Sequence, residues 1–170
     1  ISNISGTDIV ASMVVFVDGK PKKGEYKRFS LRDLAGQDDY ASMRQTLSRR
    51  FAHYLAKDPG FEETPDLLLI DGGIAHACVA AQVLTELGLT FSVFGMVKDG
   101  RHRTRALVTP DGKEINIDSQ QSVFSLIGNI QEETHRFAIT YHRSLRSKRL
   151  KYSELDGIPG IGPKRKEDLL

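Results

Sequence analysis

The residue best placed to do chemistry is Asp71, which follows the apolar run Leu67–Ile70 and precedes Gly72 and Gly73. A short continuous apolar run is typical of a central strand buried on both faces, and ligand sites in α/β proteins lie where such strands end. A carboxylate at this point suits a hard cation, and glycines let a backbone or a phosphate come close. The same residues would also make a plain turn, so the spacing alone leaves both interpretations open.

Two histidines lie near the end of a long helical pattern. His135 falls at the edge of the apolar stripe of that helix, and His142 lies seven residues further on, near the same side. A histidine in such a place can be a metal ligand or a general base, although a surface or helix-packing histidine is the more frequent outcome. Neither histidine, nor the single cysteine Cys78, has the spacing of a zinc site.

The last residues hold a third feature, the sequence GIPGIGPKRK over residues 157–166. The turn Gly160-Ile161-Gly162 ahead of a helix would present backbone N–H groups at the positive end of the helix dipole, with Lys164 and Arg165 directly behind it. The pattern is typical of a helix-hairpin-helix element, which binds the DNA backbone without reading bases. A flexible Gly/Pro linker is the alternative.

The charges of the chain are separated although its net charge is small. The 170 residues include 24 Lys and Arg against 22 Asp and Glu, a formal charge of +2. Two basic segments leave the rest of the chain with an excess of acids, which suggests a localised contact with a polyanion, although a solvated helix end and a charged loop would give the same pattern. The basic residues are Lys98, Arg101, Arg103 and Arg105 in one segment, and Arg136, Arg143, Arg146, Lys148, Arg149 and Lys151 in the other.

Several classes of protein are excluded by what the sequence lacks. It has no apolar stretch long enough to span a bilayer, no signal peptide, no Walker loop, no Ser-His-Asp arrangement and no dinucleotide fingerprint. A single cysteine fits a reducing compartment, so we expect a cytoplasmic protein with no membrane partner and no small-molecule substrate. Both ends of the sequence resemble cut ends, and we expect a fragment.

The order of elements predicts a mixed α/β fold. Strands are expected over residues 9–17, which close on the turn signal Asp18-Gly19, over 25–31, where apolar and charged residues alternate, and over 67–70 and 91–97. Helices are expected over 38–57, 75–87 and 122–146, and a hairpin over 106–117. The composition changes at Tyr152, where glycines and prolines gather. We therefore expect a domain over residues 1–151 and a linker with a partial helix-hairpin-helix over residues 152–170.

Taken together, several segments of the sequence resemble those of the UvrC family, the incision nuclease subunits of bacterial nucleotide excision repair. The resemblance covers essentially the whole chain and is carried by ISNISGTDIVASMVVFVDGKPKKGEYKRF, GQDDYASMRQTLSRRF, LLLIDGG, MVKDGRHRT, EETHRFAITYHR and LDGIPGIGPKRKEDLL. It implies a ribonuclease-H-like mixed sheet flanked by helices and incision on the 5′ side of damaged double-stranded DNA, with a UvrB helicase–DNA complex as partner.

The resemblance also assigns roles to residues. It implies that Asp71 and His135 hold Mg²⁺ or Mn²⁺, with His135 as ligand or general base, and that Asp39 is tied to incision. The basic residues would lie along the DNA backbone. The first-strand aspartate of the family would stand just before Ile1. Ile74-Ala75-His76 replaces the family's Lys-Gly-Gln, and Ser2-Asn3 its Ser-His. A catalytically silent module that binds DNA or protein is the rival from another class, and an RNA-processing nuclease is a third hypothesis.

Overall fold

The computed structural model describes residues 2–4, 10–31 and 38–156, with side chains over 10–31 and 38–141. The elements in chain order are β1 (Ser2–Ile4), β2 (Val10–Met13), β3 (Phe16–Val17), β4 (Lys20–Pro21), a 3₁₀ turn (Lys23–Glu25), β5 (Lys27–Ser30), α1 (Asp39–Leu55), β6 (Leu67–Ile70), α2 (Ile74–Glu86), β7 (Ser92–Lys98), β8 (Thr104–Val108), β9 (Glu114–Asn116) and α3 (Gln121–Asp156). The mixed α/β order predicted from the sequence is confirmed.

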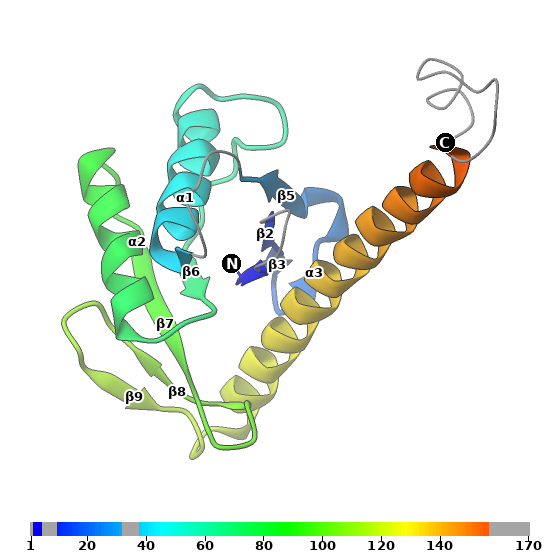
Figure 1. The fold of residues 1–170 in the computed structure, drawn as a ribbon. Helices are drawn as coiled ribbons and strands as arrows, with labels where there is room; N and C mark the ends of the chain where they lie inside the picture. Colours follow the sequence, from blue (N-terminus) through cyan, green and yellow to red (C-terminus); the bar gives the residue numbers. More distant parts are fainter. Residues whose placement is uncertain (1, 5–9, 32–37, 157–170) are drawn as a thin grey trace.

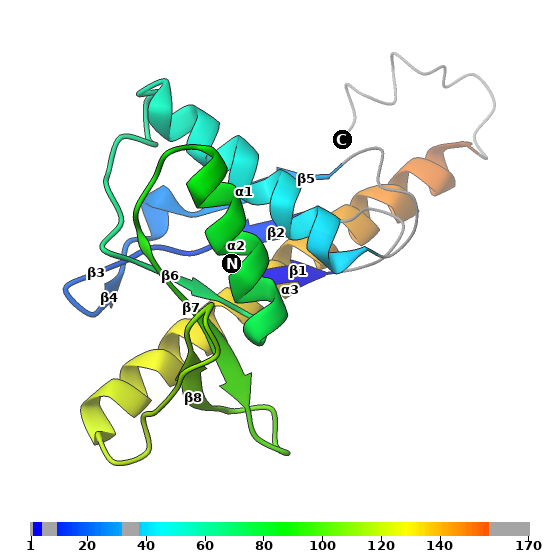
Figure 2. The same cartoon turned by 90° about the vertical axis from the view of Figure 1, so that its left-hand side faces the viewer.

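The strands form two main sheets between layers of helices. An antiparallel sheet has the order β1-β2-β5, and a second sheet has the order β6-β7-β8-β9. In the second sheet β6 and β7 are parallel, because α2 carries the chain back across the sheet, whereas β8 and β9 are antiparallel to their neighbours. Helices α1 and α2 lie on one side of the strands and α3 on the other (Figures 1 and 2).

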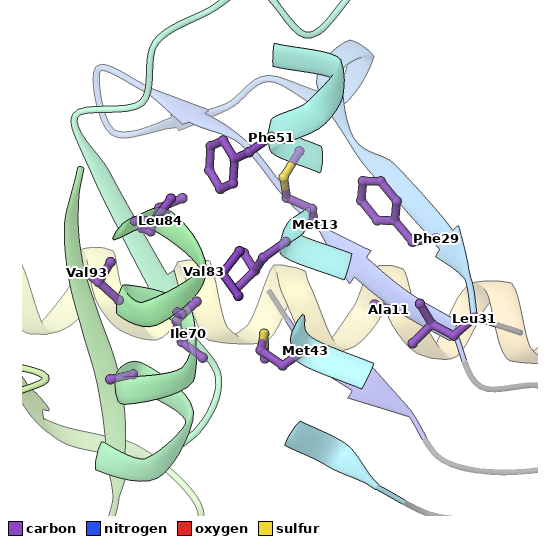
Figure 3. Close-up of a cluster of buried hydrophobic side chains, with 14 residues drawn as sticks. Ala11, Met13, Phe29, Leu31, Met43, Phe51, Ile70, Val83, Leu84 and Val93 are labelled. Atoms are coloured by element: carbon purple, nitrogen blue, oxygen red, sulfur yellow. The ribbon is translucent and has the colours of Figure 1, made fainter. Parts of the chain in front are cut away.

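Helices α1 and α2 cover the larger hydrophobic cluster. Met43, Leu47 and Phe51 of α1 follow one another at four-residue steps, and each is no more than 1% exposed. They meet Ile70 of β6 and residues of α2, β2 and β5 (Figure 3). This is the stripe that the sequence predicts, because residues four apart share one face of a helix.

Strand β6 lies between two clusters of buried side chains. Leu68 and Ile70 belong to the cluster under α1 and α2, whereas Leu69 packs against the smaller cluster under α3. The expected burial on both faces is therefore confirmed for these residues, but Leu67 is 41% exposed. The expected central place of the strand is wrong for its sheet, where β6 stands at the end of the order β6-β7-β8-β9.

The expected strand over residues 9–17 is divided into two. Strand β2 ends at Met13, and β3 then pairs with β4 in a separate hairpin whose loop is Asp18-Gly19. Both loop residues have positive φ, 50° and 73°, which is the backbone that a two-residue hairpin turn requires. The Asp-Gly turn signal was therefore correct, although the strand before it was not continuous.

Helix α3 is longer than the sequence analysis expected, ending at Asp156 instead of near Arg146. Its C-terminal half extends away from the sheets (Figures 1 and 2). No helix in the described part of the chain is both long and apolar enough to cross a bilayer. The helix-hairpin-helix at residues 157–170 lies outside the described residues, and the division into 1–151 and 152–170 stays a prediction.

The packing of α1 predicts unequal costs for two truncations on the same helix. Phe51 is 1% exposed and its ring lies 5.4 Å from that of Phe91, whereas Leu55 is 50% exposed. Phe51→Ala should lower the free energy of unfolding by about 3–5 kcal/mol because it leaves a cavity. Leu55→Ala should cost about 1 kcal/mol or less. Urea unfolding measures both, and equal losses would contradict this packing.

Candidate active site at the end of strand β6

Asp71 stands on a turn that is pressed against the neighbouring strand. It directly follows Ile70, which pairs with Gly95 of β7. The Gly72 amide donates to the Ile70 carbonyl at 2.9 Å, and Gly73 is the N-cap of α2. A Cβ on Gly95 would lie 2.6 Å from the Gly72 carbonyl oxygen and 2.9 Å from that of Gly73, closer than real contacts allow. The turn can therefore occupy this place only because residue 95 has no side chain.

The carboxylate of Asp71 is nearly buried and is paired with a lysine. Its side chain is 9% exposed, and the Lys98 Nζ lies 2.5 Å from its Oδ1. Lys98, the last residue of β7, is 37% exposed. A carboxylate this deeply buried needs a compensating charge, which Lys98 supplies. Lys98 was predicted to lie along the DNA backbone, whereas the structure places it on the candidate catalytic carboxylate.

The first turn of α1 lies beside the first turn of α2. The Asp38 side chain caps α1 by accepting from the Tyr40 and Ala41 amides at 3.0 and 2.9 Å. The Tyr40 ring is 4.8 Å from the ring of His76, which itself lies close under Gly72. Asp39 is exposed at this same end of α1. The structure thus brings the Asp38-Asp39-Tyr40 phrase to the helix that begins after Asp71, with Asp38 as the capping residue.

His135 lies on the exposed side of α3. Its neighbour Thr134 is 1% exposed, whereas His135 is exposed. The helix is held at this level by Gln131, whose Oε1 accepts from the Thr104 amide at 2.9 Å and whose Nε2 donates to the His102 carbonyl at 2.7 Å. These bonds fix α3 to the beginning of β8.

A second set of contacts holds α3 against the segment around β5. The Tyr26 hydroxyl donates to Glu133 at 3.0 Å, and its ring packs edge-on against Phe137 at 5.0 Å. Arg136 also pairs with Glu133, at 2.6 Å. Burial, with the bond to Glu133, raises the pKa of Tyr26 to about 12. The hydrogen bond from Arg136 lowers the pKa of Glu133, so this carboxylate stays charged.

The sequence did not predict the residues that hold α3 in place, which are Tyr26, Gln131 and Glu133. Tyr26 and Glu133 are 107 positions apart, and nothing in the spacing of either phrase indicates that they meet. Gln131 stands in the same helical phrase as His135, but its partners belong to a loop and a strand. The one sequence signal for these contacts was the alternating pattern over residues 25–31. It predicts that Tyr26 lies on a strand-like segment but does not indicate that Glu133 is its partner.

The basic loop between β7 and β8 is folded around Asp99. Its Oδ1 accepts from the Arg101 and Arg103 amides at 2.8 and 2.9 Å, and its Oδ2 pairs with the Arg103 guanidinium at 3.2 Å. The backbone hydrogen bond from Arg103 is the largest cause of the lowered pKa of Asp99. His102 adopts a φ of 61°, so the loop is a tight turn. The acid between the basic residues organises this loop.

Most of the predicted DNA contacts whose side chains the structure describes already have an acidic partner. Arg105 pairs with Glu114 across β8 and β9 at 3.1 Å, as Arg103 pairs with Asp99 and Arg136 with Glu133. Arg101 is exposed, and no side-chain partner of it appears among the described residues. Surface ion pairs are weak, and a phosphate can take the place of the acid. The side chain of Arg143 and all of Gly160, Gly162, Lys164 and Arg165 lie outside the described residues.

The donor chemistry of Asp71 fits a divalent cation, but the described residues supply little else. Oxygen donors are what Mg²⁺ and Mn²⁺ prefer, and Asp71 offers a fixed carboxylate, whose Oδ1 is paired with Lys98 in this structure. Over residues 10–31 and 38–141, however, no three His, Cys, Asp or Glu side chains come together as a metal site. Within that part of the chain, no third His, Cys, Asp or Glu side chain therefore forms a metal site with Asp71 and His135.

Comparison with known proteins points to one family. The model of the UvrC RNase H endonuclease domain matches residues 1–139. UvrABC system protein C of Thermoanaerobacter pseudethanolicus is 52% identical over 99% of this chain, and that of Clostridium novyi is 47% identical over 100%. The chain spans 29% of the length of each of these relatives. Because the family model covers most of the chain and agrees with its mixed α/β architecture, the chain belongs to the UvrC RNase H endonuclease domain family and has a ribonuclease-H-like fold.

Proposed function

We propose that this chain is the nuclease core of a UvrABC excision repair protein and hydrolyses a phosphodiester on the 5′ side of damaged double-stranded DNA. Its partners would be that DNA and the UvrB helicase–DNA complex. The observation that carries the proposal is Asp71, a carboxylate that is 9% exposed on a turn fixed against Gly95. Burying a charged group costs free energy, and ionisable groups in such surroundings cluster at functional sites.

In this proposal the chain's own residues bind and orient the substrate. Asp71 would hold Mg²⁺ or Mn²⁺ together with the family's first-strand aspartate, and His135 would be a further ligand or the general base. The bound ion would polarise the scissile phosphate and lower the pKa of a water. Asp39 stands at the exposed start of α1, where an acid is also favoured by the helix dipole. Arg101 would bind the DNA backbone together with Arg103 and Arg105, whose acidic partners a phosphate can replace.

A catalytically silent DNA- or protein-binding module remains the rival function. It is favoured by the pairing of Asp71 with Lys98 and by the absence of a three-ligand cluster among the described residues. Divalent ions separate the two functions, since a silent module binds DNA equally well with and without them and never cuts it. Comparing DNA with RNA substrates tests the third hypothesis, an RNA-processing nuclease.

Removing the proposed catalytic groups should abolish incision. In a nicking assay on lesion-containing duplex with the partner helicase and Mg²⁺ or Mn²⁺, Asp71→Asn and His135→Ala should each slow the 5′ cut by about 100-fold or more. Asp66→Asn is the matched control, because Asp66 is an exposed aspartate just before β6. Parent-like rates in Asp71→Asn or His135→Ala would refute the assignment of that residue.

The turn that carries Asp71 should be sensitive to a single methyl group. Gly95→Ala would force the carbonyls of Gly72 and Gly73 away from β7, since the new Cβ would lie under 3.0 Å from both. We expect incision to fall by at least about 10-fold, as remote displacement of a catalytic group does. Gly24→Ala is the control, because a Cβ there meets nothing within 4 Å. Parent-like incision by Gly95→Ala would show that the turn is not held in this way.

The basic loop should contribute to DNA affinity in a salt-dependent manner. Arg101→Ala should weaken binding to duplex DNA irrespective of sequence and reduce the slope of log affinity against log salt by about 1. Lys20→Ala removes the same charge from the β3–β4 hairpin and serves as the control. Filter binding or fluorescence anisotropy over a salt series measures both slopes. Equal slopes for the two variants would place the DNA elsewhere.

A further inference from the structure

The ion pair between Asp71 and Lys98 joins two unequal partners. Asp71 is 9% exposed, whereas Lys98 is 37% exposed. The acid is held by the backbone, because the turn that follows it rests on Gly95. The lysine is at the end of β7, where the register with β8 shifts between Val97 and Lys98, and the Asp99–Arg103 loop begins directly after it. The Asp71 carboxylate is thus fixed by the backbone, whereas Lys98 lies at the end of its strand, next to a loop.

We infer that Lys98 is an exchangeable counter-ion of Asp71, which neutralises this carboxylate when no divalent cation is bound and gives up its place when one binds. The inference rests on the proposed metal-binding function of Asp71 and adds a role to Lys98. It makes Lys98 a positioning residue, because its ammonium holds the Asp71 carboxylate in place before the metal binds.

The chemistry of the two side chains determines which one moves. A lysine ammonium is a point charge on a flexible four-carbon stem, so it can swing away without any change of backbone. Asp71 has a short side chain on a turn with no room to shift toward β7. Two cations cannot share the same carboxylate oxygen at contact distance without strong repulsion. Metal and lysine therefore compete for the Oδ1 that Lys98 now occupies.

The counter-ion role can be tested first without any metal. In the full-length protein with EDTA, Lys98→Met should lower the Tm by about 2–4 °C, because a buried carboxylate loses the ammonium group that is paired with it. In an Asp71→Asn background the same Lys98→Met change should leave the Tm unchanged. A loss of Tm that is equal in both backgrounds would mean that Lys98 acts through packing alone and would overturn the inference.

Competition with the metal is tested by Mn²⁺ titration followed by electron paramagnetic resonance of the free ion. Removing the competing ammonium in Lys98→Met should tighten the Asp71-dependent Mn²⁺ site by about 5-fold or more. Lys20→Met, which removes an exposed lysine from β4, should leave the affinity at the parent value. An unchanged or weaker affinity in Lys98→Met would overturn the inference.

The two proposals fail in distinguishable ways. If Asp71→Asn leaves Mn²⁺ binding at the parent level, the metal site itself is wrong and the inference falls with it. If Asp71→Asn abolishes the site while Lys98→Met does not tighten it, the metal site stands and only the exchange between lysine and metal is refuted. The EDTA measurement reports on the pair independently of either result.

Discussion

The close approach of the Asp71-Gly72-Gly73 turn to Gly95 is the contact on which the candidate site depends. Parallel pairing places Ile70 opposite Gly95, so the residues after Ile70 must pass directly over β7. A side chain at residue 95 would meet the carbonyls of Gly72 and Gly73 below 3.0 Å. Gly95 therefore allows the turn to pack directly against β7. This contact brings α2, which begins at Ile74, close to the sheet. The position of Asp71 is a property of two backbones in contact.

The position of His135, the other residue proposed to act in catalysis, depends on how α3 is held. Gln131 binds the beginning of β8, and Glu133 binds Tyr26, so two hydrogen bonds fix the helix in the turn before His135. Arg28 adds to this by lying over the rings of Phe137 and Tyr141, at 4.1 and 4.7 Å. A histidine on a helix that cannot rotate has a defined direction. These contacts preorganise the His135 side of the molecule as Gly95 does the Asp71 side.

What could be predicted from the sequence divides by the range of the interactions. Helices α1 and α2, the Asp18-Gly19 turn and the strand before Asp71 depend on local periodicity and turn residues, and they were found within a few residues. The pairing of Lys98 with Asp71 and of Tyr26 with Glu133 depends on segments that meet only after folding. The division of the 9–17 strand was missed because its apolar run continues past the point where pairing with β5 ends. The resemblance to a family assigned roles to Asp71 and His135 that spacing alone left open.

The cation beside Asp71 comes from the neighbouring strand and not from the helix that follows the turn. The UvrC resemblance implies a lysine directly after the two glycines, where this chain has Ile74, which is 46% exposed. His76 two residues later packs against Tyr40 and beneath Gly72. The positive group beside the carboxylate is Lys98, at the end of β7. A buried acid needs a nearby cation but does not require it from a particular position in sequence, because the Coulomb energy depends on the distance between the charges and on the dielectric around them. The fold meets that need from the neighbouring strand, which leaves α2 free to begin with a hydrophobic residue.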